Sequence, residues 1–339
     1  MPDWGGGYTA EFGISEVNPD TWTASATVES VISLSKTASV NDSVPLIEQA
    51  NLSTDADFEP GWYQLVMVTG PEAREKIGLG VMKFERTSSA INHGSSVVQA
   101  SGFSVLKPAD KMKVVAGMYA PKGADGAQEA AKLLRNSCKA PVVVEGGFTL
   151  ASNVVYGIGM GYLEAAWLLL SAGGYCIQLG DDGVIYLREM PSEPVLELSR
   201  ANADLLIPGV QDDFDISGIP NRYYAIEGGS IAVAVNDSAD SAASFANTGE
   251  WSDYVDISPV RVNGETLDAY AKRKLAEMSI VTRSRTYSRE YVPDVKPYSV
   301  VRGSLGNVGL DGDMVVTAQS FACGFGIVVQ ETAVQGVSV

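Results

Sequence analysis

The chain has 339 residues, 45% of them hydrophobic, and a formal net charge of −17 from 41 acidic and 24 basic side chains. This length exceeds what one hydrophobic core usually organises, so two or three domains are expected. The acidic balance argues against free binding to DNA or to anionic lipid, because proteins that bind these surfaces are usually basic. The 35 glycines favour a β-rich fold with many tight turns.

The excess of acidic side chains has two interpretations. It either serves solubility or creates a surface that does not hold a polyanion passing close by. The N-terminal residues Met1–Gly7 have neither a basic nor an apolar segment typical of a secretory signal, and no apolar run is long enough for a membrane span. The odd number of cysteines, Cys138, Cys176 and Cys323, favours buried free thiols over a disulfide framework.

Residues 1–110 predict a first β-domain of short strands. The clearest strand covers residues 61–69, a run of aromatic and aliphatic side chains released by a turn at Glu59-Pro60-Gly61. Residues 21–40 alternate small, polar and apolar side chains and predict extended chain with a break. Further strands are predicted near residues 44–47, 78–86 and 96–106.

Residues 111–195 predict a small α+β insert domain. A helix is expected over residues 124–138, with Asp125 as its N-cap and Gln128 in the position of a capping box. A second helix, over residues 161–171, has almost no polar face and should be buried on most sides. A hairpin follows, with its turn at Asp181-Asp182-Gly183.

Residues 196–339 predict a second β-domain with a helical insertion at 264–278. A hairpin is expected from residues 221–235, and an exposed loop over residues 236–250. The final sixty residues again indicate strands. One of them, Gly312–Val316, occupies a position similar to that of the 61–69 strand, which suggests an internal repeat.

The segment Val154–Gly161 contains a Gly-x-Gly-x-Gly pattern between a strand and a helix, as in phosphate-binding turns. However, Tyr162 stands where the dinucleotide fingerprint requires glycine, and the acidic pair that follows lies in a predicted hairpin turn. We interpret the glycines as a flexible approach to a close-packed helix, so no cofactor is predicted.

The sequence offers little to a catalytic or metal site. His93 is the only histidine and lies in a predicted turn, and no Gly-x-Ser-x-Gly motif is present. The acidic clusters are interpreted as solvated loops, with calcium binding at Asp311-Gly312-Asp313 as an alternative. These clusters are Asp55, Asp57 and Glu59; Asp212, Asp213 and Asp215; and Asp311 and Asp313. No catalytic, cofactor-binding or metal-binding residue is predicted.

Three arginines alternate along one predicted strand: Arg283, Arg285 and Arg289. In a strand they share one face. Such a basic stripe in an acidic chain is either a solvated strand face or a contact with an acidic neighbouring subunit. Together with Trp62 and Tyr63, these arginines are the predicted interface residues.

The order of these features resembles that of baseplate hub, or tail-tip hub, proteins of tailed bacteriophages. Each motif alone is weak, but their order extends over most of the chain. The matching pieces are residues 45–47 (Pro-Leu-Ile), 61–63 (Gly-Trp-Tyr), 157–170 with Ala165-Ala166-Trp167-Leu168-Leu169-Leu170, 181–183 (Asp-Asp-Gly), 219–223 (Ile-Pro-Asn-Arg-Tyr), 240–242 (Asp-Ser-Ala), the helix at 264–278 and 312–314 (Gly-Asp-Met).

The resemblance implies an α+β, mainly β fold with two related β-barrel tube domains and a small α+β insert. It implies a homotrimeric, pseudo-sixfold ring that joins the tail tube to the tip and encloses the DNA channel. Expected partners are a distal tail or tail tube protein, the tape measure protein and a tail fibre or central spike, while genomic DNA passes without specific binding. The expected location is the virion, after assembly in the host cytoplasm. Because the chain ends at Val339, any peptidase or host-binding domain is expected on another protein.

Two other functional classes are considered. A host-receptor or carbohydrate-binding module would use exposed Trp62, Trp251 and Tyr254 to stack on sugars. A hydrolase would use a pair of carboxylates, although no spacing in the sequence selects such a pair.

Overall fold

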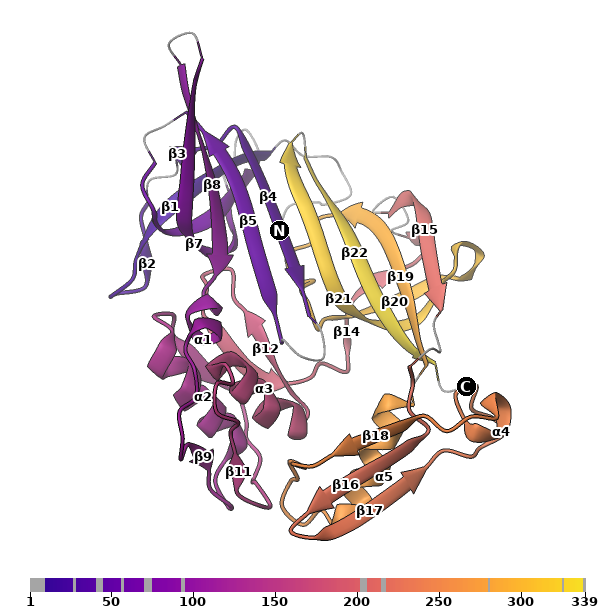
Figure 1. Cartoon of the computed structure of the whole chain (residues 1–339). Coiled ribbons are helices and arrows are strands. Elements are labelled where there is room, and N and C mark those ends of the chain that lie inside the picture. Colours follow the sequence, from indigo (N-terminus) through magenta and orange to yellow (C-terminus); the bar gives the residue numbers. More distant parts are fainter. Residues whose placement is uncertain are drawn as a thin grey trace.

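Strands dominate the computed structural model of the chain, and its helices belong to two smaller units at one end of the main sheet (Figure 1). The structure describes residues 10–26, 29–40, 45–55, 58–69, 75–92, 95–201, 206–214, 218–279, 281–324 and 326–337. This mainly β architecture confirms the fold class predicted from the sequence.

Within the described residues, a sheet of 14 strands forms the body of the molecule. Its main path runs β15-β19-β22-β21-β4-β5-β8-β7-β6-β1-β2, while β3, β14 and β20 pair off this path. The strands are β1 (Ala10–Asn18), β2 (Thr23–Ala24), β3 (Glu29–Ser30), β4 (Ser33–Ser39), β5 (Ile47–Thr54), β6 (Gly61–Thr69), β7 (Glu75–Asn92), β8 (Ser95–Ser104), β14 (Pro194–Leu198), β15 (Leu206–Phe214), β19 (Val281–Glu290), β20 (Val300–Leu305), β21 (Leu310–Gly324) and β22 (Gly326–Val337), with a short 3-10 turn, η2 (Gly306–Val308).

The insert unit lies at the end of the first half of this sheet (Figure 1). The N-cap Asp125 accepts hydrogen bonds from the backbone N–H groups of Ala127 and Gln128, which fixes the start of α2. Helix α3 is buried along most of its length, as its apolar sequence predicted. The elements of the insert unit are α1 (Lys107–Lys111), β9 (Tyr119–Ala120), α2 (Gly126–Ser137), β10 (Val142–Val144), β11 (Val154–Val155), α3 (Tyr162–Ala172), β12 (Tyr175–Leu179) and β13 (Ile185–Glu189).

A second small unit is inserted between β15 and β19. It consists of β16 (Arg222–Glu227), β17 (Ser230–Val235), α4 (Phe245–Thr248), β18 (Asp253–Asp256) and α5 (Leu267–Met278). The sheet order is β17-β16-β18, and α5 packs its buried Tyr270, Ala271 and Leu275 against β16 and β17. The predicted helix and hairpin are therefore confirmed. The predicted exposed loop at 236–250 is partly wrong, because Ser244 is fully buried and caps α4.

Four groups of buried side chains stabilise these parts. One group surrounds α2 and α3 of the insert unit and includes residues of the first half of the sheet, such as Ala38 and Val81, and another joins α5 to β16 and β17. The first half of the sheet packs around Leu65, Met82 and Phe84, and the second half around Val301, Met314 and Val316. Whether each half closes into a barrel, and whether the domain borders lie at 110 and 195, stay predictions. No helix among the described residues has the length and apolar character needed to cross a membrane.

Candidate functional site: the seam, edges and face of the large sheet

The large sheet contains the same five-strand arrangement twice. In the first half β4 pairs with β5, β5 with β8, β8 with β7, and β7 with β6. In the second half β15 pairs with β19, β19 with β22, β22 with β21, and β21 with β20. All of these pairings are antiparallel, and both halves follow the spatial order first-second-fifth-fourth-third. One structural unit therefore occurs twice in the chain.

Local irregularities coincide in the two halves. The register of β7 shifts between Phe84 and Arg86, and that of β21 shifts between Val316 and Ala318. Counted back from the hairpin ends at Asn92 and Gly324, the two shifts fall at the same position. Because a bulge inserts a residue and bends a strand, its recurrence is strong support for true equivalence of β7 and β21.

The equivalence extends to side chains. Gly80 and Gly312 have positive φ angles of 106° and 83°, and each lies two residues before a fully buried methionine, Met82 or Met314. Only glycine adopts this backbone conformation without strain. From the sequence we predicted that Gly312–Val316 repeats the strand at residues 61–69 of the same chain, and this prediction is wrong. The Gly312 strand corresponds to β7, whereas β6 corresponds to β20.

A seam between β4 and β21 joins the two halves. One edge of β21 is shared by two strands: residues 310–315 pair with β20, and residues 318–323 pair with β4. Along the seam, Thr37 lies opposite Ser320 and Ser35 lies opposite Ala322. The sheet therefore runs from one half into the other without an interruption of its antiparallel pairing.

The seam has an unoccupied counterpart. In β7, residues 75–84 pair with β6, but within the described chain residues 85–92 have no partner on that same edge. Likewise β15, which is equivalent to β4, pairs only with β19 in the part of the chain that the structure describes. These two edges correspond to the two strands that meet at the internal seam. Unpaired strand edges are ready to add a further strand.

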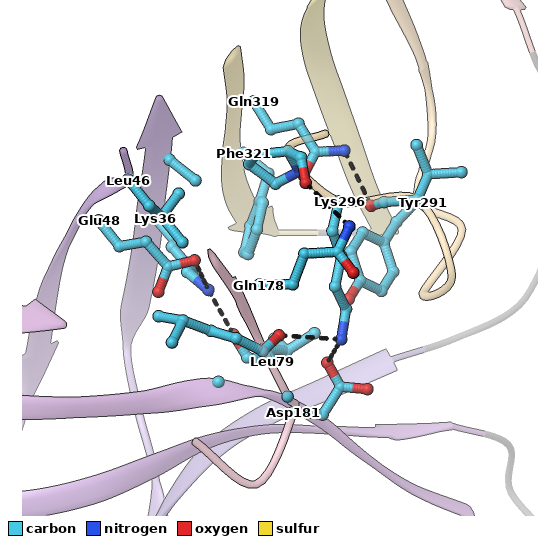
Figure 2. A pocket seen from close by; sticks show the side chains of 16 residues that line it. Lys36, Leu46, Glu48, Leu79, Gln178, Asp181, Tyr291, Lys296, Gln319 and Phe321 are labelled. Atoms are coloured by element: carbon cyan, nitrogen blue, oxygen red, sulfur yellow. Dashed lines mark hydrogen bonds and ion pairs between the residues drawn. The ribbon is translucent and has the colours of Figure 1, made fainter. Parts of the chain in front are cut away.

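Behind the seam, the β12–β13 hairpin holds the halves together. From the first half, Trp22 donates its indole N–H to the carbonyl of Asp182 at 2.9 Å, and Gln64 donates to the carbonyl of Asp181 at 2.9 Å. From the second half, Lys296 pairs with the Asp181 carboxylate at 2.8 Å and reaches the Leu179 carbonyl at 3.3 Å (Figure 2). We call residues 179–183 the clamp.

A small cavity lies between the clamp and the seam (Figure 2). Its volume of about 30 Å³ is enough for one or two water molecules and too small for an organic ligand. On its wall Lys36 pairs with Glu48 at 2.9 Å and donates to the carbonyl of Leu79 at 3.0 Å. The buried Glu48 Oε2 has no hydrogen-bond partner among the described residues. The cavity is therefore a structural junction.

The opposite face of the sheet is rich in hydroxyl and amide side chains. Paired residues point to the same side of an antiparallel sheet, so the register identifies the members of each row. Cross-strand hydrogen bonds join Ser33 to Ser53 at 2.7 Å and Thr286 to Thr332 at 3.0 Å. We define the hydroxyl face by the uncharged polar or small residues of these rows: Ser33, Ser35, Thr37, Ser39, Gln49, Asn51, Ser53, Gln99, Ser101, Gln211, Ser284, Thr286, Ser288, Ala318, Ser320, Ala322, Gln330 and Thr332.

None of these 18 residues is charged, but the same rows also contain charged residues at their outer strands. Asp213 lies opposite Ser284 on β15, and on β7 Arg86 lies opposite Ser101 and Lys83 lies opposite Phe103, which faces Gln49. The face crosses the seam, since the row Gln330-Ser320-Thr37-Gln49 runs over β22, β21, β4 and β5. The central rows therefore form a polar, uncharged surface that both halves share.

Two of the predicted interface arginines are buried within the chain. Arg289 and Glu331 are both completely buried and pair at 2.5 Å, and the Tyr287 hydroxyl donates to the other oxygen of Glu331 at 2.5 Å. Burial, followed by the charge of Glu331, raises the pKa of Tyr287 far above its ordinary value. Arg285 is 3% exposed and donates to Gln335 at 2.7 Å. These contacts hold β19 against β22 inside one protomer.

Arg283 is the member of the stripe with exposed surface. It forms a two-pronged ion pair with Asp212 of β15, and this guanidinium lowers the pKa of the Asp212 carboxyl. Arg283 and Asp212 therefore stabilise the last strand pair of the sheet, next to the open edge of β15. A role at a subunit interface stays a proposal for Arg283.

The two predicted aromatic interface residues, Trp62 and Tyr63, lie on β6. Trp62 packs edge-on against Trp22 at 5.5 Å, and Tyr63 stacks on Phe58 at 4.8 Å. Both side chains are partly buried. In these positions they support the first half of the sheet and the clamp, and an interface role stays a prediction.

The prediction that the acidic clusters lie in loops is wrong for two of them, because Asp212 and Asp213 belong to β15 and Asp311 and Asp313 to β21. Asp313 pairs with Arg302 at 2.6 Å on neighbouring strands, and no group of metal-binding side chains is found among the described residues. The glycine pattern leads into α3 through a turn in which Gly159 has a positive φ of 84°. His93, Asp57 and Asp215 lie outside the described residues.

No protein-family model and no curated protein matches the chain. Among solved structures it is similar to the tail protein from Neisseria meningitidis MC58, with a TM-score of 0.67 and 14% identity over 97% of each chain. It is also similar to the 43 kDa tail protein of prophage MuSo2 from Shewanella oneidensis, with a TM-score of 0.66 and 12% identity over 97% of this chain and 99% of that one.

A third similar structure is prophage tail protein gp18 from Listeria monocytogenes EGD-e, with a TM-score of 0.52 and 9% identity over 95% of this chain and 94% of that one. The chain therefore has the fold of phage tail proteins. This confirms, at the level of the fold, the resemblance that the order of sequence motifs indicated.

Proposed function

We propose that the protein is a structural component of a phage tail tip, in which three copies form a ring around the DNA channel. Its location is the virion tail, after assembly in the host cytoplasm. It joins a distal tail or tail tube protein, the tape measure protein, and a tail fibre or central spike. The role is mechanical, and no catalytic residue is assigned to it.

The observation that carries this proposal is the duplicated strand unit with its internal seam. Each copy supplies two equivalent units, already joined edge to edge by β4 and β21. Because residues 85–92 of β7 and the outer edge of β15 leave the same two edges open among the described residues, copies can repeat the seam head to tail. Three copies then place six equivalent units around one axis, which suits a junction between sixfold and threefold parts.

The hydroxyl face supports the placement of DNA inside the ring. Lysine and arginine bind phosphates and release counterions, so a wall that bears them holds a passing duplex. The central rows of this face, which cross β22, β21, β4 and β5, have no lysine or arginine among the 18 residues of the hydroxyl face, and Lys83 and Arg86 stand only at their outer strand, β7. A wall whose central rows are polar and uncharged lets a polyanion slide.

One observation favours a second function, binding of a host carbohydrate. Tyr254 is 45% exposed and stacks on Tyr223 at 5.2 Å with one face of its ring, whereas Trp251 is covered by Phe245 on one face and by the guanidinium of Arg222 on the other. An exposed aromatic ring can stack on a sugar. A glycan array with the wild type and with Tyr254→Ala tests this: binding that depends on Tyr254 supports it, and silence of the wild type removes it.

The ring is tested by native mass spectrometry and negative-stain micrographs of the purified full chain. The proposal expects a three-chain species and ring-shaped particles with a central hole, at protein concentrations in the micromolar range or above. A chain that stays monomeric over this range and shows no rings contradicts the proposal.

A further inference from the structure

We propose that β15 of one copy pairs with residues 85–92 of β7 in the next copy, in the register of the internal β4–β21 seam. This inference rests on the proposed ring and specifies its contact: the partner is a second copy of this chain, bound by main-chain hydrogen bonds between two strand edges. Such pairing is a general way for a chain to extend a sheet.

The choice of edges follows from the internal repeat. At the seam, the first strand of one unit, β4, pairs with the later part of the fourth strand of the other unit, β21. The equivalents of these strands are β15 and β7, and within the described residues the corresponding edge of each has no partner. The same pairing cannot form inside one copy, because β15 and β7 stand on opposite sides of the seam in the order of the sheet.

The other outer edges fit less well. At the far end of the sheet, β2 and β3 are two residues long and already cover β1. Strand β14 begins with Pro194, which lacks a backbone N–H, and pairs in parallel with β20. Neither edge has an equivalent that takes part in the internal seam, so neither has a template for pairing.

The repeat also gives the register. Ser320 and Ser88 are equivalent because each lies four residues before its hairpin end, and they face Gln330 and Gln99 in turn. Asp213 is equivalent to Thr37, since Ser284 and Gln49, which face them, occupy matching places in β19 and β5. Thr37 lies opposite Ser320 at the seam. Asp213 of one copy is therefore expected opposite Ser88 of the next.

This placement continues the hydroxyl face from copy to copy. Gln211 and Asp213 lie on one side of β15, where Gln211 donates to Asp213 at 2.9 Å. Opposite them, Ser88 points to the side of the sheet that carries Gln99. The contact adds one carboxylate, and no lysine or arginine, to these two rows.

The test is a disulfide between copies in the double variant Asp213→Cys/Ser88→Cys. Directly opposed residues of antiparallel strands have Cα atoms roughly 4.5–5.5 Å apart, within the range of a disulfide. Mild oxidation of the full chain is expected to move the monomer band to a three-chain band on a denaturing gel, reversed by reductant. Each single variant, which keeps the native Cys323, should stay monomeric on that gel.

The matched control is Asp213→Cys/Thr87→Cys. A slip of one residue turns a side chain to the other face of the sheet, so this pair should not close. If native mass spectrometry shows trimers but Asp213→Cys/Ser88→Cys gives no cross-link, or the control links equally well, the strand pairing is refuted and the ring stands. If neither variant nor the wild type forms trimers, the ring itself fails.

Discussion

Lysines placed on the hydroxyl face should convert a wall that releases DNA into one that holds it. Gln49 and Gln330 are both exposed and stand in one row, separated by β4 and β21. Three strand spacings put them roughly 14 Å apart, beyond a Debye length of about 8 Å, so two lysines there repel each other little. We expect Gln49→Lys/Gln330→Lys to fold and to form the same ring as the wild type.

The magnitude follows from the number of added cations. Two lysines in each of three copies place about six charges around the channel, and about six phosphate contacts make the affinity fall roughly 10³-fold between 50 and 200 mM salt. The assay compares linear with covalently closed circular duplex DNA, because only a linear duplex can thread a closed ring. Linear DNA should be retained at low salt, and circular DNA should not.

The control variant is Gln128→Lys/Asn136→Lys, which adds the same charge to two exposed positions on α2. It should hold linear and circular DNA equally weakly. If rings of the Gln49→Lys/Gln330→Lys variant bind both forms of DNA alike, or bind linear DNA no better than the control rings, the hydroxyl face does not line the channel.

Two predictions concern stability, measured by urea unfolding. Glu331→Leu leaves the fully buried Arg289 without its carboxylate and should cost about 3–5 kcal/mol. Asp212→Asn removes one partner of a partly exposed ion pair and should cost no more than about 1 kcal/mol, so equal effects would contradict the burial argument. Gly80→Ala forces a side chain onto a φ of 106° and toward the Lys36 ammonium, so it should cost about 1–3 kcal/mol, and Gly306→Ala, in open space, should stay within about 0.5 kcal/mol. Similar losses for the two glycine variants would refute the strain argument.

Elements with complete local signals were predictable from the sequence. Helix α2 has an N-cap at Asp125 and an apolar stripe, and α3 is apolar on nearly all sides, so capping and periodicity define both. The β12–β13 hairpin was predicted from its turn at Asp181-Asp182-Gly183. In each case the residues that determine the element lie within one or two turns of it.

Features that depend on distant partners were not predictable. Most of β5 was missed, because its polar alternation (Gln49, Asn51, Ser53) has no large apolar residue on the exposed side. Arg289 was predicted to lie at a subunit interface because its internal partner could not be foreseen. That partner, Glu331, is 42 residues away in the sequence, and only the pairing of β19 with β22 brings the two together. The sequence prediction matched the Gly312 strand to β6 instead of β7. The features that β7 and β21 share are the positive φ angles of Gly80 and Gly312 and a later β-bulge, and neither can be recognised in the sequence.

The clamp explains why a ring of six equivalent units would have only threefold symmetry. The insert unit occurs once in each chain, between the two halves, so its residues 179–183 brace the internal seam and contact Lys296 and Trp22 there. A seam between copies repeats the strand pairing, but this clamp is already used within its own chain. Half of the seams in a trimer would therefore be braced by side-chain contacts with the clamp and half would rest mainly on main-chain hydrogen bonds. The seams between copies are then the weaker ones, and dilution or denaturant should open them before the internal seam separates.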